Sequence, residues 1–324
     1  MDPLSDVLSL LKPRSYGCGG IDTGGDVAIS FPKHDGIKCY AVVSGEGWLA
    51  VEGVLDAVHL STGDCFVLPR GLPFRLASDL ALTPVDYRTV LAGRPPGVVI
   101  SFNGGGDSMI VGGHFALDGK HAGMLLGVLP PIVHIRSESD KATLRASLDW
   151  MMQELREPKP GGLLIVEHLA QMMLVQALRL HMAEGQNGRV GWLFALADSQ
   201  IGPAISAMHA DPAHRWTLQS LAERAGMSRT TFAQKFKATV GTPPMDYLTR
   251  WRMMVAGDKL TNSNDSISTV APAFGYESES AFSTAFKRVM GCSPRQYSKG
   301  RAPASPRPDE RIDVRASRLG PASG

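Results

Sequence analysis

Short apolar segments separated by turn residues fill the first third of the sequence. From Ala28 to about Leu117 these segments are rich in Val, Ile, Phe and Tyr, and Ser-Gly, Glu-Gly and Gly-Asp pairs divide them. This pattern is typical of β-strands joined by tight turns. Many short strands in close succession favour an antiparallel barrel or sandwich over alternating strands and helices. The predicted strands are 38–43, 47–53, 55–60, 64–69, 97–102 and 109–117.

Helical spacing of apolar residues begins after Pro130-Pro131. Residues 139–157 carry leucine and methionine at intervals of three and four, which predicts a helix with one apolar face. Proline and glycine at 158–162 end this helix, and a second helix is expected from about Leu163 to Met182. Because the second helix is apolar on most of its circumference, we expect it to be buried against the sheet, its partner helix or another subunit.

A repeat with a spacing of 50 residues occupies the C-terminal third. SRTTFAQKFKATVGTPPMDY (228–247) aligns with SESAFSTAFKRVMGCSPRQY (278–297), and seven of twenty positions are identical. Upstream the match continues at an offset of 49 residues, so the second copy has one additional residue near Glu277.

Each copy predicts two helices joined by a short turn. In the first copy Thr217 and Ser228 are candidate N-caps, and Gly226 can end the first helix in the left-handed conformation. Phe232 and Phe236 share one face of the second helix and can anchor it to a small core. The arrangement is a helix-turn-helix. A connecting helix from Pro243 to about Leu260 would span about 27 Å, comparable with the roughly 34 Å between successive major grooves.

Polar and basic side chains lie opposite these phenylalanines, where hydroxyl and amide groups can reach base edges in a major groove. Arg250 and Arg252 of the connecting helix are candidates for phosphate contact, but their commoner role on a helix is solvated surface or pairing with acids such as Asp246. The alternative for the whole repeat is a pair of helical hairpins that serves only as a scaffold. The candidate DNA-binding residues are Arg229, Thr230, Thr231, Ala233, Gln234, Lys237, Glu279, Ser280, Ser283, Thr284, Lys287 and Arg288.

The charge is unevenly distributed along the 324 residues. The formal net charge is +2, but residues 1–210 hold 16 basic and 21 acidic residues (−5), residues 211–300 hold 12 and 7 (+5), and residues 301–324 hold 5 and 3 (+2). A basic segment following an acidic one is expected where one end of a protein meets a polyanion. The length indicates two or three domains.

The composition excludes several other classes of protein. Hydrophobic content of 44% and charged content of 20% are values of a globular protein. No uncharged apolar run approaches the roughly 18 residues that span a bilayer, and the N-terminus lacks the basic region of a secretory signal. The four cysteines are far apart in the sequence, which favours a reducing cytoplasm over a disulfide framework.

The C-terminal repeat resembles a known family. Residues from about Gln200 to Tyr297 are similar to the DNA-binding domain of AraC/XylS-type transcription regulators, in WTLQSLAERAGMSRTTFAQKF, YLTRWRMMVAGDKL and ISTVAPAFGYESESAFSTAFKRVMGCSPRQY. The resemblance implies seven helices, of which Ile201 to His209 is the first. Two features depart from the family. Pro272 is expected to kink or shorten the first helix of the second motif, and Gln234 and Thr284 stand where many members have Arg.

The N-terminal region resembles a cupin without its metal ligands. GDCFVLPRGLPF (63–74) fits the second cupin motif at Gly63, Pro69 and Gly71, but Phe74 stands where a metal-binding cupin has His. The His-x-His cluster of the first motif is also missing, and only His34 is nearby, so we expect no metal and no cofactor. The segment is similar to the cupin-like ligand-binding domain of many AraC-type regulators over about residues 3–185, and the sequence does not identify its ligand-binding residues.

We therefore expect an α+β protein with an N-terminal cupin-like antiparallel β-barrel, flanking helices and a C-terminal all-α domain with two helix-turn-helix motifs. The predicted boundaries are 1–185 for the sensor domain, with dimerisation helices at about 139–182, 186–197 for a linker, 198–300 for the DNA-binding domain and 301–324 for a disordered tail.

The expected function is that of a transcription regulator without catalytic residues, and the resemblance favours an activator. Its expected partners are double-stranded DNA, an unidentified small-molecule effector, a second copy of the chain and RNA polymerase, in the cytoplasm at the nucleoid and without a membrane. Two alternatives remain: a metal-free or atypical cupin enzyme with an accessory helical domain, and a constitutive DNA-binding regulator with a vestigial cupin.

Overall fold

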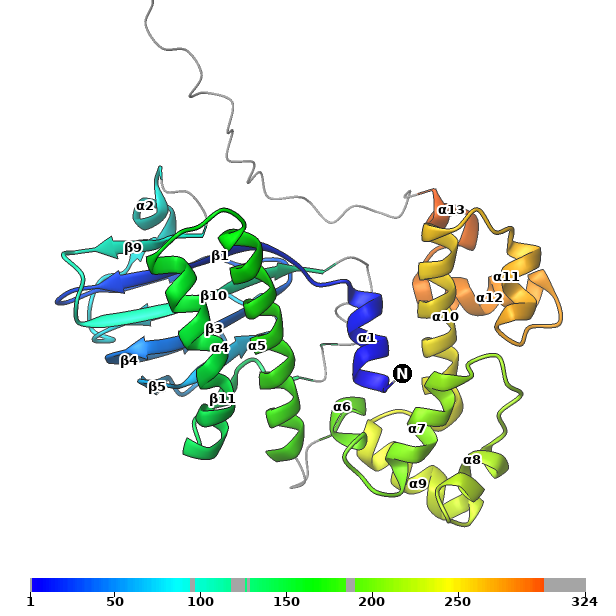
Figure 1. Ribbon diagram of the computed structural model, residues 1–324. Helices are drawn as coiled ribbons and strands as arrows, with labels where there is room; N and C mark the ends of the chain where they lie inside the picture. The colour runs from blue at the N-terminus through cyan, green and yellow to red at the C-terminus, as the bar shows by residue number, and fades with distance from the viewer. Residues whose placement is uncertain (1, 94–96, 118–125, 127–128, 185–189, 300–324) are drawn as a thin grey trace, which may run out of the picture. The chain divides into compact units, whose positions relative to one another are not determined.

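A computed structural model describes residues 2–93, 97–117, 126, 129–184 and 190–299 (Figure 1). The chain forms two compact units, Met1–Met254 and Val255–Gly324, which divide within helix α10 (Pro244–Asn262). The predicted disordered tail and the first part of the predicted linker lie outside the described residues.

The strands form two sheets. The first has the order β11-β6-β3-β10-β1-β9 and the second the order β5-β4-β7-β2-β8. Neighbouring strands are antiparallel except for the pairs β1–β9 and β2–β8, which are parallel. The first sheet contains β1 (Arg14–Thr23), β3 (Ile37–Ser44), β6 (Cys65–Leu68), β9 (Val99–Phe102), β10 (Ser108–Ala116) and β11 (Val133–Ile135). The second contains β2 (Ala28–Phe31), β4 (Glu46–Val51), β5 (Val58–Ser61), β7 (Phe74–Ala77) and β8 (Val85–Asp86).

The predicted antiparallel β-structure and the α+β class are confirmed, but the barrel is not closed. Each sheet ends in its own edge strands, because among the described residues no strand pairing joins the two sheets. The domain is therefore a sandwich of two sheets.

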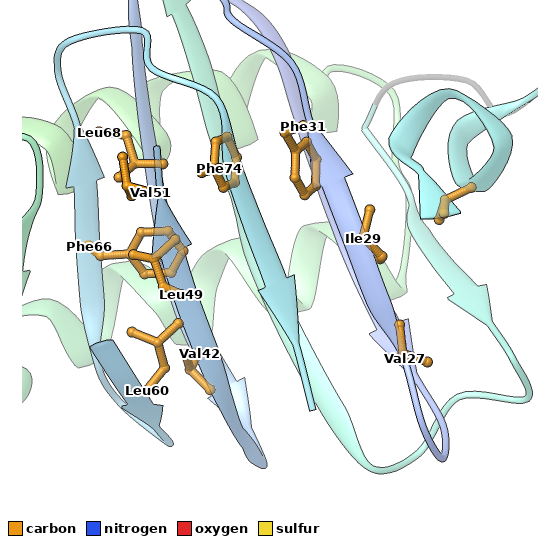
Figure 2. Close-up of a cluster of buried hydrophobic side chains, with 11 residues drawn as sticks. Val27, Ile29, Phe31, Val42, Leu49, Val51, Leu60, Phe66, Leu68 and Phe74 are labelled. Atoms are coloured by element: carbon orange, nitrogen blue, oxygen red, sulfur yellow. The ribbon is translucent and has the colours of Figure 1, made fainter. Parts of the chain in front are cut away.

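The hydrophobic core of the sandwich lies between the sheets (Figure 2). Val42, Phe66 and Leu68 come from the first sheet, whereas Phe31 and Phe74 come from the second and stack with ring centroids 4.4 Å apart. Full burial of each such side chain contributes about 1.5–3 kcal/mol. The core contains the motif residue Phe74, which occupies the position expected of a metal-binding His in other cupins.

Glycines allow the strands of the first sheet to approach closely. A Cβ atom on Gly112 of β10 would lie 2.1 Å from the carbonyl oxygen of Cys39 on β3. On β1, a Cβ on Gly19 would lie 2.8 Å from the carbonyl oxygen of Val98. The glycine-rich strand β1 was not among the predicted strands, because it shows little alternation of apolar and polar residues.

Two long helices cover the outer face of the first sheet (Figure 1). They are α4 (Glu138–Arg156) and α5 (Gly162–Glu184), and they confirm the two helices predicted there. In the described part of the chain, α5 is the one helix whose length and mean hydropathy of 1.4 would suffice to cross a membrane. It contacts α4 and strands β1, β6, β10 and β11, and this packing accounts for the apolar side chains that α5 buries.

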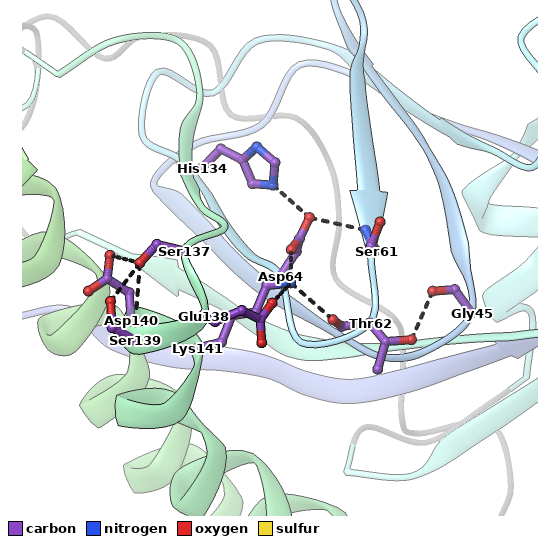
Figure 3. Close-up of polar contacts among 10 residues, drawn as sticks. All are labelled: Gly45, Ser61, Thr62, Asp64, His134, Ser137, Glu138, Ser139, Asp140 and Lys141. Atoms are coloured by element: carbon purple, nitrogen blue, oxygen red, sulfur yellow. Dashed lines mark hydrogen bonds and ion pairs between the residues drawn. The ribbon is translucent and has the colours of Figure 1, made fainter.

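A buried carboxylate ties α4 to the sheet (Figure 3). Asp64 accepts hydrogen bonds from Lys141 Nζ at 2.9 Å, from His134 Nε2 at 2.9 Å and from the backbone N–H of Ser61 at 3.0 Å. Burial opposes the ionisation of Asp64, but the hydrogen bonds from Lys141, Ser61 and His134 hold its pKa below the ordinary value. The first turn of α4, capped by Ser137, is thereby fixed to β11 and to the turn before β6.

The remaining helices include the seven that the family resemblance implied. These are α7 (Ile201–Ala210), α8 (Leu218–Arg224), α9 (Arg229–Val240), α10, α11 (Ile267–Ala273), α12 (Glu279–Met290) and α13 (Pro294–Ser298). The short helices of the N-terminal region that lie wholly within the described residues are α1 (Pro3–Leu11) and α2 (Tyr87–Leu91). The segment interpreted as a linker contains a further helix, α6 (Trp192–Ala195), whose four side chains are all buried. This part of the predicted linker is therefore packed.

Candidate nucleic-acid interface

The first helices of the two motifs have the same length and the same kind of N-cap. Helix α8 begins after Thr217, whose side chain accepts from the backbone N–H of Ser220. Helix α11 begins after Ser266, whose side chain accepts from the N–H of Thr269. Each helix has seven residues, so Pro272 does not shorten α11 as expected. The proline removes only one backbone donor near the end of a short helix.

The second helices, α9 and α12, begin and end in the same way. Ser228 caps α9 by accepting from the N–H of Thr231, and Ser278 caps α12 by accepting from the N–H of Ala281. Both helices end at a glycine in the left-handed region, with φ of 87° at Gly241 and 74° at Gly291. Glycine adopts this conformation without the steric cost that other residues incur.

A pair of phenylalanines anchors each of these helices. The ring centroids of Phe232 and Phe236 are 5.5 Å apart, and those of Phe282 and Phe286 are also 5.5 Å apart. All four side chains are fully buried. Tyr247 then meets Phe236 edge-on in the first unit, at a distance of 5.8 Å between centroids.

The second motif repeats this aromatic contact with Tyr297, which lies 5.4 Å from Phe286. Burial raises the pKa of Tyr247 far above its ordinary value and that of Tyr297 to about 12. Both tyrosines pack edge-on against a phenylalanine of their motif, and the anchoring role predicted for the phenylalanines is confirmed.

The faces opposite the phenylalanines are exposed in the same order in both motifs. Residues 228–238 and 278–288 share one succession of exposed, half-buried and buried side chains, position by position. Of the twelve candidate DNA-binding residues, Ala233 and Ser283 are half-buried and the other ten are exposed. The structure distributes them as six on α9 and six on α12, and the compact units to which these helices belong are separate.

Two basic side chains near the first motif are engaged within the protein. Lys235 of α9 lies 2.9 Å from Asp198 Oδ2 and donates to Gln200 Oε1 at 2.7 Å. Arg252 of α10 donates to the carbonyl oxygens of Pro212 and His214 at 2.6 and 2.7 Å. Arg252 therefore holds the segment before α8, a role that sequence spacing could not reveal because its partners are backbone carbonyl groups.

Asp198, which lies just before α7, binds Lys235 of α9. Burial disfavours its charged form, yet hydrogen bonds from the N–H of Ile201, from Lys235 and from the N–H of Gln200 lower its pKa. The carboxylate therefore remains charged and binds Lys235, which leaves Lys237 as the exposed basic residue on the later turns of α9.

The interior of the sandwich contains a buried cation that the sequence did not identify. Lys38 of β3 is 8% exposed, and its ammonium lies 5.0 Å from the ring centroid of Phe31, 5.3 Å from that of Phe74 and 5.8 Å from that of Tyr87. At these distances the faces of aromatic rings attract a cation. We call Lys38 and these three rings the lysine cage.

Histidine side chains adjoin the lysine cage. The His34 ring lies 5.9 Å from Phe74 and 5.4 Å from His114 between centroids. Burial, followed by the nearby charges of Lys38 and His114, lowers the pKa of His34 to about 3. Within the described residues, no group of three or more His, Cys, Asp or Glu side chains is placed to hold a metal ion.

Comparisons with known proteins match both halves of the chain. A family described as cupin matches residues 2–183, and a family described as helix-turn-helix domain matches residues 221–300. Over 300 residues the chain is 41% identical to a putative AraC-like transcription regulator of Streptomyces lividans, covering 92% of this chain and 98% of that one. It is 40% identical to a protein of the same description from Streptomyces antibioticus, covering 92% and 99%. Identity to the HTH-type transcriptional regulator AlkR of Acinetobacter baylyi is 27%, covering 92% and 99%.

Proposed function

The chain belongs to the AraC family of DNA-binding transcription regulators, and from this premise we propose that it activates transcription in response to a small molecule bound by its cupin domain. The observation that carries the proposal is the matching exposed face of α9 and α12. Two reading helices built alike suit two successive major grooves on one side of a DNA duplex.

The proposed DNA contacts are the twelve candidate residues on α9 and α12. Gln234 is exposed in the middle of α9 and can form a bidentate pair with adenine, whereas Thr284 at the same position of α12 has one hydroxyl in place of the amide's separate donor and acceptor atoms. Lys237 and Lys287 are exposed one turn further along and suit contact with phosphate. Because α9 and α12 have matching backbones but different exposed side chains, they support recognition of two half-sites that differ in sequence.

The lysine cage supports an effector site between the sheets. The Lys38 ammonium is buried among aromatic rings, and the neighbouring His34 is neutral. An effector with an anionic group would interact strongly with a cation in such a low-dielectric setting. The effector can regulate only if it binds one conformation of the protein more tightly than another, because equal affinity for both shifts no equilibrium.

Exposed apolar side chains on α4 and α5 support dimerisation through these helices. Trp150 of α4 is 66% exposed, and Leu164 and Met172 of α5 are 58% and 41% exposed. Large exposed apolar residues on covering helices are typical of an interface with another protein. A dimer would present two pairs of reading helices to DNA, and contact with RNA polymerase in the cytoplasm would complete the activation.

Two experiments test this function. Genomic footprinting with the purified full-length protein should give a defined set of protected sites, and Gln234→Ala should change the preferred sequence at one half-site. Thermal unfolding with a panel of small organic acids should find a compound that stabilises the wild type but not Lys38→Met. Bound metal together with turnover of a substrate would favour the enzyme alternative, and DNA binding that no compound alters would favour a constitutive regulator.

A further inference from the structure

The two reading helices differ most at their first residue. Helix α9 begins with Arg229 and α12 begins with Glu279, and both side chains are exposed. When 228–247 is aligned with 278–297, this is the one pair of residues whose charge changes sign. Because the caps, the phenylalanine pairs and the exposure patterns agree, the two side chains occupy corresponding places on their motifs.

Because of this sign change, the two helices present different net charges to DNA. Helix α9 carries Arg229, Lys235 and Lys237 and no acid, a net charge of +3, whereas α12 carries Glu279, Lys287 and Arg288, a net charge of +1. A carboxylate is repelled by the phosphate backbone, so Glu279 cannot contribute to affinity that is independent of sequence. Any favourable contact that it makes with DNA has to be with a base.

The chemistry of the major groove narrows the choice of base. An ionised carboxylate only accepts hydrogen bonds, and the donors in the major groove are the N4 amino group of cytosine and the N6 amino group of adenine. Adenine places the acceptor N7 beside its amino group, which repels the second carboxylate oxygen. Cytosine is therefore the better partner for Glu279. The first turn of a reading helix is also the part that reaches base edges.

We propose that Glu279 is a specificity-determining residue that reads the amino group of cytosine in the half-site bound by the second motif. This proposal rests on the proposed function, because it requires α12 to lie in a major groove. Arg229, in the corresponding place on α9, donates to guanine or to phosphate. The carboxylate is also stabilised by the positive end of the α12 dipole.

The test compares the DNA sequences that full-length variants select from a random pool of duplexes. The wild type should require a C·G pair at one position of the second half-site. Glu279→Gln should change that requirement to A·T, because the amide matches both the N6 amino group and N7 of adenine. The discrimination at this position should be about 5-fold or more. Glu279→Ala should relax it, with only a small loss of thermal stability, because the side chain is exposed and its interaction with the helix dipole is weak.

Glu277→Gln is the matched control, since it removes the same charge two residues earlier, in the turn before α12. It should leave the selected sequence unchanged. If Glu279→Gln and Glu277→Gln both raise affinity for all duplexes and select the wild-type sequence, Glu279 acts only by repulsion and the proposal is overturned. If the wild type itself selects no sequence, both the proposed function and the proposal for Glu279 are overturned.

Discussion

The imidazole of His209 on α7 lies flat against the indole of Trp251 on α10, with ring centroids 3.7 Å apart and an angle of 11° between the planes. The Nε2 atom of His209 is 2.7 Å from the hydroxyl oxygen of Tyr247, and Nδ1 is 3.7 Å from Asp6 Oδ2 of helix α1. Burial lowers the pKa of His209 to about 3. The neutral ring thus packs α7 against α10, the helices on either side of the first helix-turn-helix, and its Nδ1 lies near Asp6 of α1 without a hydrogen bond to it.

Acid should therefore destabilise this part of the protein. His209 binds a proton in the unfolded chain below about pH 6.5 but not in the folded chain, so its contribution to stability is fully present above pH 6.5 and is lost as the pH falls towards 3. The free energy of unfolding should decrease by up to about 1.4 kcal/mol per pH unit from this group. Chemical unfolding of wild type and His209→Phe between pH 7 and pH 5 measures the difference in slope.

Tyr247→Phe is the control, because it removes the hydroxyl near His209 and keeps the buried imidazole. Its stability should fall with acid as steeply as that of the wild type. If stability falls with pH equally steeply in the wild type and in His209→Phe, groups other than His209 bind the protons that destabilise the fold.

The helix-turn-helix repeat could be predicted in detail because its signals are local. A serine cap, a glycine stop and two phenylalanines four residues apart lie within fifteen residues, and the structure realises each of them in both copies. The lysine cage could not be predicted in this way. Lys38 lies in a predicted strand, but the three aromatic rings around its ammonium belong to β2, β7 and α2. Only the pairing of strands brings these rings and the ammonium together.

Strand β1 shows the same limit of local patterns. Its glycines give no apolar alternation, and their role is to admit carbonyl groups of neighbouring segments, as at Gly19 and Val98. Whether the predicted barrel closes could not be predicted for a related reason: strand lengths and turns are visible in a sequence, but the pairing of edge strands depends on distant parts of the chain.

Gly112→Ala should destabilise the cupin domain strongly. The new methyl group would lie 2.1 Å from the carbonyl oxygen of Cys39, and the backbone of β3 has to move to accept it. We expect a loss of more than about 3 kcal/mol, in the range of severe overpacking. Gly17→Ala on the neighbouring strand β1 is the matched control, since its nearest contact is at 3.9 Å. Urea unfolding that ranks the two variants equally would contradict this account.

Asp64→Asn should detach the first turn of α4 from the sheet. The amide cannot balance the charge of Lys141, whose side chain is 11% exposed, and removal of one partner of a buried ion pair costs about 3–5 kcal/mol. Glu138→Gln removes the other carboxylate on Lys141, at 3.0 Å, but Glu138 is 82% exposed. That control should lose less than about 1 kcal/mol. Thermal unfolding measures the loss of stability in each variant. Similar losses for Asp64→Asn and Glu138→Gln would contradict the role of Asp64 as the buried acceptor.

Trp150→Ala should weaken self-association without unfolding the monomer, because the indole is 66% exposed. An interfacial tryptophan contributes about 2 kcal/mol or more, which corresponds to about a 30-fold higher dissociation constant. Sedimentation equilibrium measures the constant directly. Arg145→Ala, on the same helix and also exposed, should leave it nearly unchanged. A wild type that is monomeric at all concentrations would contradict dimerisation itself, and equal constants for the two variants would place the interface elsewhere.

Lys287→Ala should weaken binding to every DNA sequence by a similar factor. Lys287 is exposed on the third turn of α12, opposite Phe286 and Phe282, where its ammonium suits a phosphate rather than a base edge. Loss of one phosphate contact should reduce the slope of log K against log salt by about 1. Titrations at several salt concentrations on a selected site and on unrelated duplex provide both slopes. Lys159→Ala removes the same charge from the turn between α4 and α5 and should change neither slope. A loss confined to the selected site would assign Lys287 to base recognition instead.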